Sequence, residues 1–96
     1  MLYYVYVLQS VRFKKLYIGF TSNITNRLKE HNNGLSQATK PYIPYDLIFY
    51  ETFINKRDAK NREKYLKTGW GLRSLKKTLK NSLQIESKSA RKFSLF

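Results

Sequence analysis

The sequence contains no cysteine, a single histidine and few acidic residues. The absence of cysteine excludes disulfides, thiolate metal sites and thiol nucleophiles. The lone histidine, His31, cannot build a zinc site with other His or Cys ligands, because there are none. Long hydrophobic runs are missing too, since no segment approaches the ~20 apolar residues that a transmembrane helix needs. The apolar start lacks the basic lead and cleavage site of a signal peptide, so we expect a β-strand there and a cytoplasmic protein by default.

Acidic residues are strongly outnumbered by basic ones. Six Asp or Glu against 19 Lys or Arg give a formal net charge of +13 and an isoelectric point near 10.1. Neutralising phosphates releases condensed counterions, so such a surface should bind nucleic acid with a steep salt dependence. Charge alone fits a ribosomal or chromatin-like binding protein, or one that lies on an anionic membrane, at least as well as an enzyme.

Two runs of β-branched and aromatic residues open the sequence. Leu2–Gln9 and Lys15–Phe20 flank a short polar stretch and predict a β-hairpin. Side chains alternate between the faces of a strand, so Tyr17 and Gly19 should share one face of the second strand. By the same alternation, Tyr6 should point to one face of the first strand.

A helix is predicted after the hairpin. Thr21-Ser22-Asn23 supplies N-cap side chains, and the helix should run to about Asn33, where Gly34 tolerates left-handed dihedral angles. Arg27 and His31 are four residues apart and lie along the edge of the apolar stripe of this helix.

The middle of the sequence predicts a loop, a strand and a second helix. Residues 35–45 contain both prolines and indicate an irregular loop, and Asp46–Phe53 indicates a third strand. Asn55 should cap a helix that runs through Lys67 and is ended by Gly69. Glu63 lies on the inward stripe of this helix.

From about Gly71 the pattern predicts a short basic helix with leucines on one side. Its opposite side carries Lys76, Lys77 and Lys80. The expected fold is a small single α/β (α+β) domain of ββαβαα order, with a central three-stranded antiparallel sheet flanked by helices. This domain should span residues 1–80, and residues 81–96 should form a basic C-terminal tail that is either flexible or docked through its apolar residues.

The order and spacing of these residues resemble the GIY-YIG nuclease superfamily. Tyr4-Val5-Tyr6 stands where the first motif belongs, and Tyr17-Ile18-Gly19 matches the second literally. Arg27 and His31 match the helix that follows, and Glu63 matches the single metal-binding glutamate of a later helix. Each piece alone occurs by chance in many proteins, so the resemblance depends on their order and spacing together.

The resemblance covers roughly Leu2 to Leu79 and is greatest to the small stand-alone bacterial members. The first motif has Tyr-Val-Tyr in place of Gly-Ile-Tyr, which keeps the tyrosine. The asparagine that many members carry near the end of the domain has no assigned counterpart here. Asn81 is a candidate position for it, and without it the positioning of substrate stays open.

The resemblance implies a metal-dependent endonuclease that hydrolyses phosphodiester bonds, most plausibly in DNA during repair or processing. Glu63 would hold one Mg²⁺ or Mn²⁺, since these hard ions keep several waters and take other ligands from the phosphate. Arg27 would stabilise charge that develops on the phosphate. Tyr6 would take the proton of the attacking water, and Tyr17 would orient water or phosphate. His31 would relay the proton or donate to the phosphate.

These residues also have purely structural explanations. Tyr6 and Tyr17 fit half-buried strand aromatics, Arg27 fits a surface residue whose stem covers apolar neighbours, and His31 fits a hydrogen-bonded residue at a helix end. Glu63 differs from the others, because an inward carboxylate is costly unless a cation or hydrogen bonds meet it.

The alternative function is a non-catalytic nucleic-acid-binding module that retains the GIY-YIG fold. Its phosphate contacts would come from Lys76, Lys77, Lys80, Lys88, Arg91 and Lys92. In either case we expect nucleic acid as the partner, DNA ahead of RNA, no membrane partner, and a monomer or weak dimer. A protein partner that supplies specificity is compatible with both functions.

Overall fold

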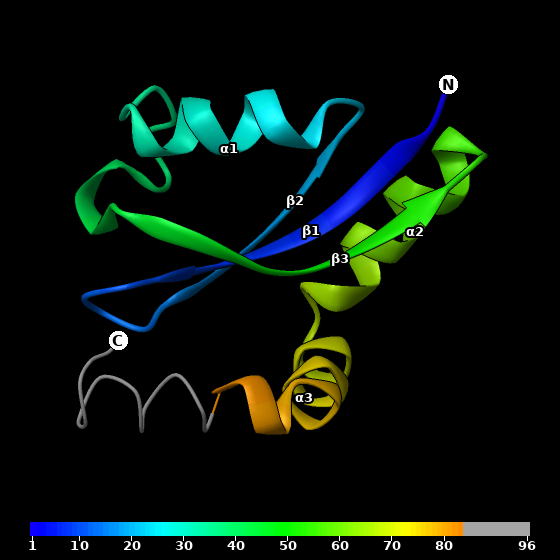
Figure 1. Ribbon diagram of the computed structural model, residues 1–96. Coiled ribbons are helices and arrows are strands. Elements are labelled where there is room, and N and C mark those ends of the chain that lie inside the picture. Colours follow the sequence, from blue (N-terminus) through cyan, green and yellow to red (C-terminus); the bar gives the residue numbers. More distant parts are fainter. Residues whose placement is uncertain (84–96) are drawn as a thin grey trace. The chain divides into compact units, whose positions relative to one another are not determined.

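The protein is an α+β domain of the expected element order. The computed structural model describes residues 1–83. Its elements are β1 (Tyr3–Ser10), β2 (Leu16–Thr21), α1 (Ile24–Asn32), the 3-10 helix η1 (Lys40–Tyr42), β3 (Tyr45–Phe53), α2 (Lys56–Leu66) and α3 (Gly69–Thr78) (Figure 1). The predicted strand bounds 2–9, 15–20 and 46–53 each fall within one residue of these. Most of the tail predicted for residues 81–96 lies outside the described residues.

The three strands form one antiparallel sheet with β1 in the middle. The order is β2-β1-β3, so β2 and β3 are the edge strands. The register places Gly19 of β2 and Tyr50 of β3 on either side of Tyr6, and pairs Tyr17 with Leu8. Residues 5–10 of β1 are all buried, as expected for a central strand that is covered on both faces.

Helix α1 is fixed at both ends by its sequence. The Asn23 side chain accepts a hydrogen bond from the Asn26 amide at 3.1 Å, so the N-cap is one of the three residues 21–23 predicted to supply it. Asn33 is the C-cap, and Gly34 follows with φ of +76°. The Asn32 side chain exchanges two hydrogen bonds with the backbone of Tyr45, at 2.8 and 3.1 Å. These bonds attach the C-terminal end of α1 to the start of β3.

Helix α1 packs on the sheet face that carries Tyr6 and Leu8. These two side chains and Tyr45 form a buried cluster. Partly buried residues from α1, from the loop after it and from β2 and β3 pack against this cluster: Tyr17, Ile24, Leu28, Tyr42, Ile43 and Leu47. The apolar stripe predicted for the helix is therefore its packing face.

Helix α2 contacts the opposite face of the sheet. Arg62 forms a two-pronged ion pair with Glu51, at 2.9 and 3.2 Å, and the Lys60 ammonium lies 4.5 Å from the centre of the Phe20 ring. Glu51 and Phe20 both pair with Val5, whose side chain points away from Tyr6. The sheet is therefore covered by α1 on one side and by α2 on the other (Figure 1).

Helix α2 ends at Leu66, one residue before the predicted end at Lys67, but the prediction that Gly69 ends this helix is wrong. Gly69 is instead the first residue of α3. Thr68 makes the break, because its hydroxyl donates to the Tyr65 carbonyl at 2.7 Å and accepts from the Gly71 amide at 3.1 Å. One side chain thus satisfies a carbonyl at the end of α2 and an amide at the start of α3.

The chain divides into two compact units, Met1–Lys64 and a second unit that begins at Tyr65. All five residues predicted to be catalytic belong to the first unit. Within the described residues, none of the helices combines the length and apolar composition needed to cross a membrane.

Candidate active site

The hydroxyl of Tyr6 reaches its position by passing over Gly19 on the neighbouring strand. The two residues face each other directly across β1 and β2. A Cβ atom added at Gly19 would overlap the Oη and Cζ atoms of Tyr6. Any side chain at this position would therefore displace the phenol. The glycine of Tyr17-Ile18-Gly19 is needed for close approach of the Tyr6 ring.

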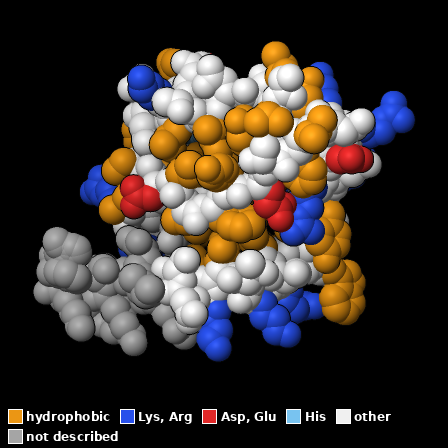
Figure 2. All heavy atoms as spheres, turned by 45° about the vertical axis from the view of Figure 1, so that its right-hand side comes forward, with side chains coloured by type: hydrophobic (Ala, Val, Ile, Leu, Met, Phe, Trp, Pro, Cys, Tyr) orange, Lys and Arg blue, Asp and Glu red, His pale blue; other side chains and the backbone are white. Residues whose placement is uncertain are grey.

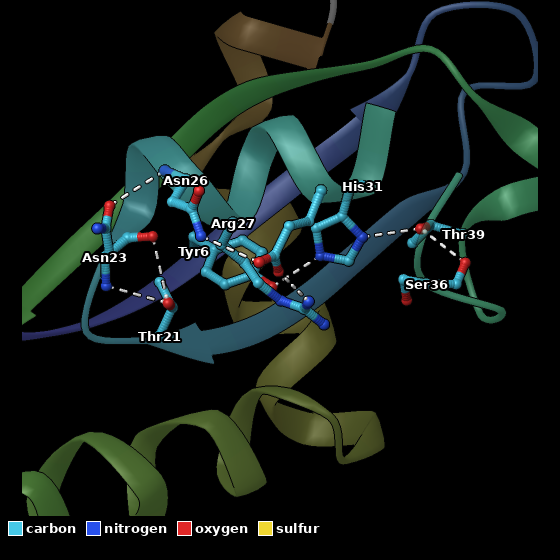
Figure 3. Close-up of polar contacts among 9 residues, drawn as sticks. Tyr6, Thr21, Asn23, Asn26, Arg27, His31, Ser36 and Thr39 are labelled. Carbon is cyan, nitrogen blue, oxygen red and sulfur yellow. Dashed lines mark hydrogen bonds and ion pairs between the residues drawn. The ribbon is translucent and has the colours of Figure 1, made fainter. Parts of the chain in front are cut away.

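A buried chain of hydrogen bonds begins at the Tyr6 hydroxyl. Its Oη lies 2.9 Å from Nε2 of His31, and Nδ1 of His31 lies 2.7 Å from Oγ1 of Thr39. The Thr39 hydroxyl in turn donates to the Ser36 carbonyl at 3.4 Å. Tyr6 is 2% exposed, and His31 and Thr39 are fully buried. Figure 3 shows Tyr6 and Thr39 on opposite sides of the imidazole ring.

This series of hydrogen bonds indicates which atom donates the proton in each bond. Thr39 has one hydroxyl hydrogen, and when it is donated to Ser36 the oxygen accepts from Nδ1–H of His31. Nε2 is then the unprotonated nitrogen of a neutral imidazole, so the Tyr6 hydroxyl donates to it. This arrangement forms all three hydrogen bonds. In the other tautomer Thr39 would have to donate to His31, and the Ser36 carbonyl would lose its hydrogen bond from Thr39. The tautomer is thus assigned from the network of partners.

The Tyr6 phenol and the His31 imidazole are both neutral near pH 7. Burial raises the pKa of Tyr6 to about 12; hydrogen bonding with Arg27 opposes this, and negative charge on Tyr17 or Glu63 adds to it. Burial, with the positive charge of Arg27, lowers the pKa of His31. The contact between the two rings is therefore a hydrogen bond from a neutral phenol to a neutral imidazole.

Arg27 lies beside the Tyr6 hydroxyl and is held by Glu30. Its Nη1 is 2.7 Å from Oε1 of Glu30, and the two side chains are 33% and 36% exposed. Asn26 donates to the other oxygen of Glu30 at 3.0 Å. The hydrogen bond with Glu30 raises the pKa of Arg27, so the guanidinium is always charged. A phosphate that binds Arg27 would compete with Glu30 for it.

Tyr17 lies beside Tyr6 and His31, and Glu63 affects Tyr6 through its charge. The Tyr17 ring lies on the same face as Tyr6, with ring centres 6.3 Å apart, and its centre is 4.9 Å from that of His31. Glu63, on α2, is half-buried and close enough for its charge to raise the pKa of Tyr6. Two phenols, an imidazole and a guanidinium thus lie close together on one face of the sheet, and Glu63, on the helix that covers the other face, is linked to them by the effect of its charge on Tyr6.

Comparison with known proteins identifies the family of the chain. Residues 2–71 match the family model described as the GIY-YIG catalytic domain. The chain belongs to the GIY-YIG family. The match covers the two tyrosine motifs, Arg27, His31 and Glu63, and it ends within α3.

Several similar proteins are small bacterial members of this family. The chain is 43% identical to a UPF0213 protein of Clostridium perfringens over 67% of its own length and 69% of the relative. It is 34% identical to a UPF0213 protein of Pediococcus pentosaceus over 86% and 87%. The solution NMR structure of a UPF0213 protein of Bacillus halodurans superposes with a TM-score of 0.54 at 25% identity, covering 93% of this chain and 96% of that one. The predicted fold and family are thereby confirmed.

The GIY-YIG residues are not all placed as the sequence suggested. His31 was expected at the edge of the apolar stripe of α1, yet it is fully buried. Burial is tolerated because Tyr6 and Thr39 satisfy both ring nitrogens. The other predicted nucleic-acid contacts, Lys76, Lys77 and Lys80, are exposed and belong to the second unit. Figure 2 shows one face of the molecule, on which Lys and Arg side chains outnumber acidic ones.

The donor set of this GIY-YIG domain fits a hard divalent cation. Within residues 1–83, no group of three or more His, Asp or Glu side chains is placed to hold an ion by itself. A zinc ion held by protein ligands would need such a group. A lone carboxylate suits Mg²⁺ or Mn²⁺, which keep waters and share the oxygens of a bound phosphate. Glu63 is the residue that would hold it.

Two residues of the site were missed in the sequence. Glu30 had a signal, because it stands three residues after Arg27 on a helix, where opposite charges meet. Thr39 had none. It lies in the loop between α1 and β3, and nothing local indicates that this loop brings its hydroxyl to His31.

Proposed function

We propose that this GIY-YIG protein is a metal-dependent endonuclease that hydrolyses phosphodiester bonds, with DNA as the preferred substrate. The observation that carries the proposal is the buried 2.9 Å hydrogen bond between Tyr6 and His31, with Arg27 beside it. A phenol and an imidazole in this arrangement form a proton path, and a guanidinium beside them is suited to a phosphate.

In the proposed reaction the attacking water gives a proton to Oη of Tyr6 as Tyr6 passes its own proton to Nε2 of His31. The water oxygen forms a bond to phosphorus, the bond from phosphorus to the leaving oxygen breaks, and that oxygen takes a proton from solvent. His31 then returns its proton through Tyr6. The relay avoids a free phenolate, which would be costly for a tyrosine whose pKa burial raises to about 12, but it makes His31 a transient imidazolium, which burial and Arg27 disfavour.

Arg27 has two parts in this proposal. Its guanidinium would leave Glu30 for a non-bridging phosphate oxygen and stabilise the charge that develops there. Tyr6 is only 2% exposed. The movement of Arg27 would therefore also give the attacking water access to the Tyr6 hydroxyl. Tyr17 would orient the water or the phosphate. A divalent ion on Glu63, when bound, would supply Lewis-acid stabilisation of the phosphoryl charge.

Thr39 is proposed as the residue that positions His31. Thr39→Val keeps the shape of the side chain but removes the acceptor for Nδ1–H, so His31 should no longer be held in one tautomer. We expect kcat to fall roughly 10- to 100-fold, the range for loss of a partner that orients a functional histidine. KM should be unchanged. Because His31 is the only histidine, long-range ¹H–¹⁵N spectra of the protein report its tautomer directly.

Thr39→Ser is the matched control, since it retains the hydroxyl. It should keep both the Nδ1–H tautomer and at least most of the turnover. A role in packing alone predicts the reverse pattern, with Val tolerated and no change in the histidine spectrum. If Thr39→Val retains full turnover, Thr39 does not position His31 for the reaction.

The activity itself is tested with labelled duplex, branched and single-stranded DNA and with RNA, each in Mg²⁺, Mn²⁺ or excess chelator. We expect cleavage of DNA with either metal and none with chelator. Cleavage at full rate in chelator would reject the metal. Binding of all substrates without cleavage of any would favour the alternative, a non-catalytic module that uses its net charge of +13 to hold phosphates.

A further inference from the structure

Helix α3 presents an exposed tryptophan in strongly basic surroundings. Trp70, the only tryptophan of the chain, is the second residue of the helix and is 75% exposed. The guanidinium of Arg73, one turn later, lies 5.0 Å from the centre of its ring. An aromatic side chain of this size is seldom left so open without a partner, so it needs an explanation.

The charged residues of the segment that carries Trp70, residues 65–83, are all basic. Residues 65–83 contain no Asp or Glu. Their cations are Lys67, Arg73, Lys76, Lys77 and Lys80. A shallow hollow of about 260 Å³ adjoins this surface and is lined by Gly69, Leu72, Arg73 and Lys76. Its lining includes two cations and no acid, which suits an anionic ligand.

We propose that Trp70 is a stacking platform for an unpaired base of a nucleic acid, with Arg73 and Lys76 contacting the flanking phosphates. Arg73 covers one face of the indole, and a base would stack on the other. Stacking needs a base that has left its duplex, so the surface selects single-stranded, frayed or flipped-out segments. This inference rests on the proposed function for its class of substrate and adds the structural preference.

The other helix face argues against a membrane as the occupant. A helix that lies on a bilayer needs a broad exposed apolar face. On α3, Leu75 is buried and Leu72 is half-buried, and Leu79 just beyond its end is buried as well. Trp70 is thus the one exposed large apolar side chain of α3, and it stands among cations, which is the arrangement of single-strand binding surfaces.

Because Trp70 is the only tryptophan, its fluorescence reports on this surface alone. The full chain is titrated in chelator, which prevents cleavage, with a single-stranded oligodeoxynucleotide and with an abasic strand of equal length and charge. We expect the base-containing strand to quench the fluorescence and to bind about 5- to 100-fold more tightly than the abasic one. Equal quenching and affinity for both strands would overturn the proposal.

Substitution provides the second measurement. Trp70→Ala should weaken binding of the single strand about 5- to 100-fold and leave binding of a fully paired duplex of the same length nearly unchanged. Trp70→Phe should recover much of the loss. Because the side chain is 75% exposed, neither change should alter the circular dichroism or the melting temperature. Equal weakening for single strand and duplex would contradict the stacking role.

Lys77→Gln is the matched control for charge. It should weaken binding to single strand and duplex alike and reduce the slope of log affinity against log salt by up to about 0.7–0.9. A blue shift of the fluorescence on phosphatidylserine vesicles, without quenching by DNA, would assign the surface to a membrane instead and overturn the proposal. Loss of cleavage with intact stacking would refute only the proposed nuclease, and cleavage with no stacking would refute only this inference.

Discussion

Glu63→Gln should reduce cleavage at least about a thousandfold in saturating Mg²⁺ or Mn²⁺. The substitution keeps the size of the side chain and one acceptor oxygen, but it replaces the other oxygen with a donor and removes the negative charge proposed to hold the ion. A thousandfold loss corresponds to about 4 kcal/mol of transition-state stabilisation, within the range for an ion acting on a phosphoryl oxygen. Single-turnover rates measure the chemical loss, and Mn²⁺ titration followed by electron paramagnetic resonance measures the loss of the ion.

Asp58→Asn is the control for this experiment. Asp58 is an exposed acid near the start of the same helix, and its neutralisation changes the net charge by the same amount. Its cleavage rate and Mn²⁺ affinity should stay close to those of the unaltered protein. Unimpaired activity of Glu63→Gln, or the same loss in both variants, would remove Glu63 as the metal ligand.

Tyr6→Phe should lower the cleavage rate by about 10²- to 10⁴-fold, the usual contribution of a positioned proton acceptor. Phenylalanine keeps the ring over Gly19 but lacks the oxygen that is hydrogen-bonded to His31 and is proposed to take the proton of water. It also leaves Nε2 of the buried imidazole without its donor, which costs roughly 1–3 kcal/mol of folding stability. Rates are therefore compared below the melting temperature of the variant, with folding followed by circular dichroism.

Two other tyrosines calibrate this result. Tyr4→Phe is the matched control, because Tyr4 lies on the same strand and points to the same face, with its ring 6.0 Å from that of Tyr50. It should cleave normally. Tyr17→Phe should be slower than the unaltered protein but faster than Tyr6→Phe. If Tyr17→Phe loses more activity than Tyr6→Phe, the base is Tyr17 and the relay through His31 is wrong.

The parts of the fold that the sequence predicted well are those set by local patterns. Strand bounds followed from runs of β-branched and aromatic residues. The start of α1 followed from the polar residues 21–23, one of which, Asn23, caps the first turn. The residue that ends α2 was assigned wrongly, because glycine is a helix breaker by composition and Gly69 instead begins α3. The hydroxyl of Thr68 instead bonded to both helices, and such a bond depends on how the chain already turns.

The sequence by itself determined the α+β order, the basic charge and the family, because periodicity, composition and motif order are properties of the chain as written. Only the tertiary structure decided that the ring of Tyr6 crosses Gly19 and that His31 is enclosed between Tyr6 and Thr39. It also decided that Trp70 is left open. Contacts between residues far apart in the sequence depend on sheet register and loop path, and burial depends on every neighbour at once, so neither is encoded by any local pattern.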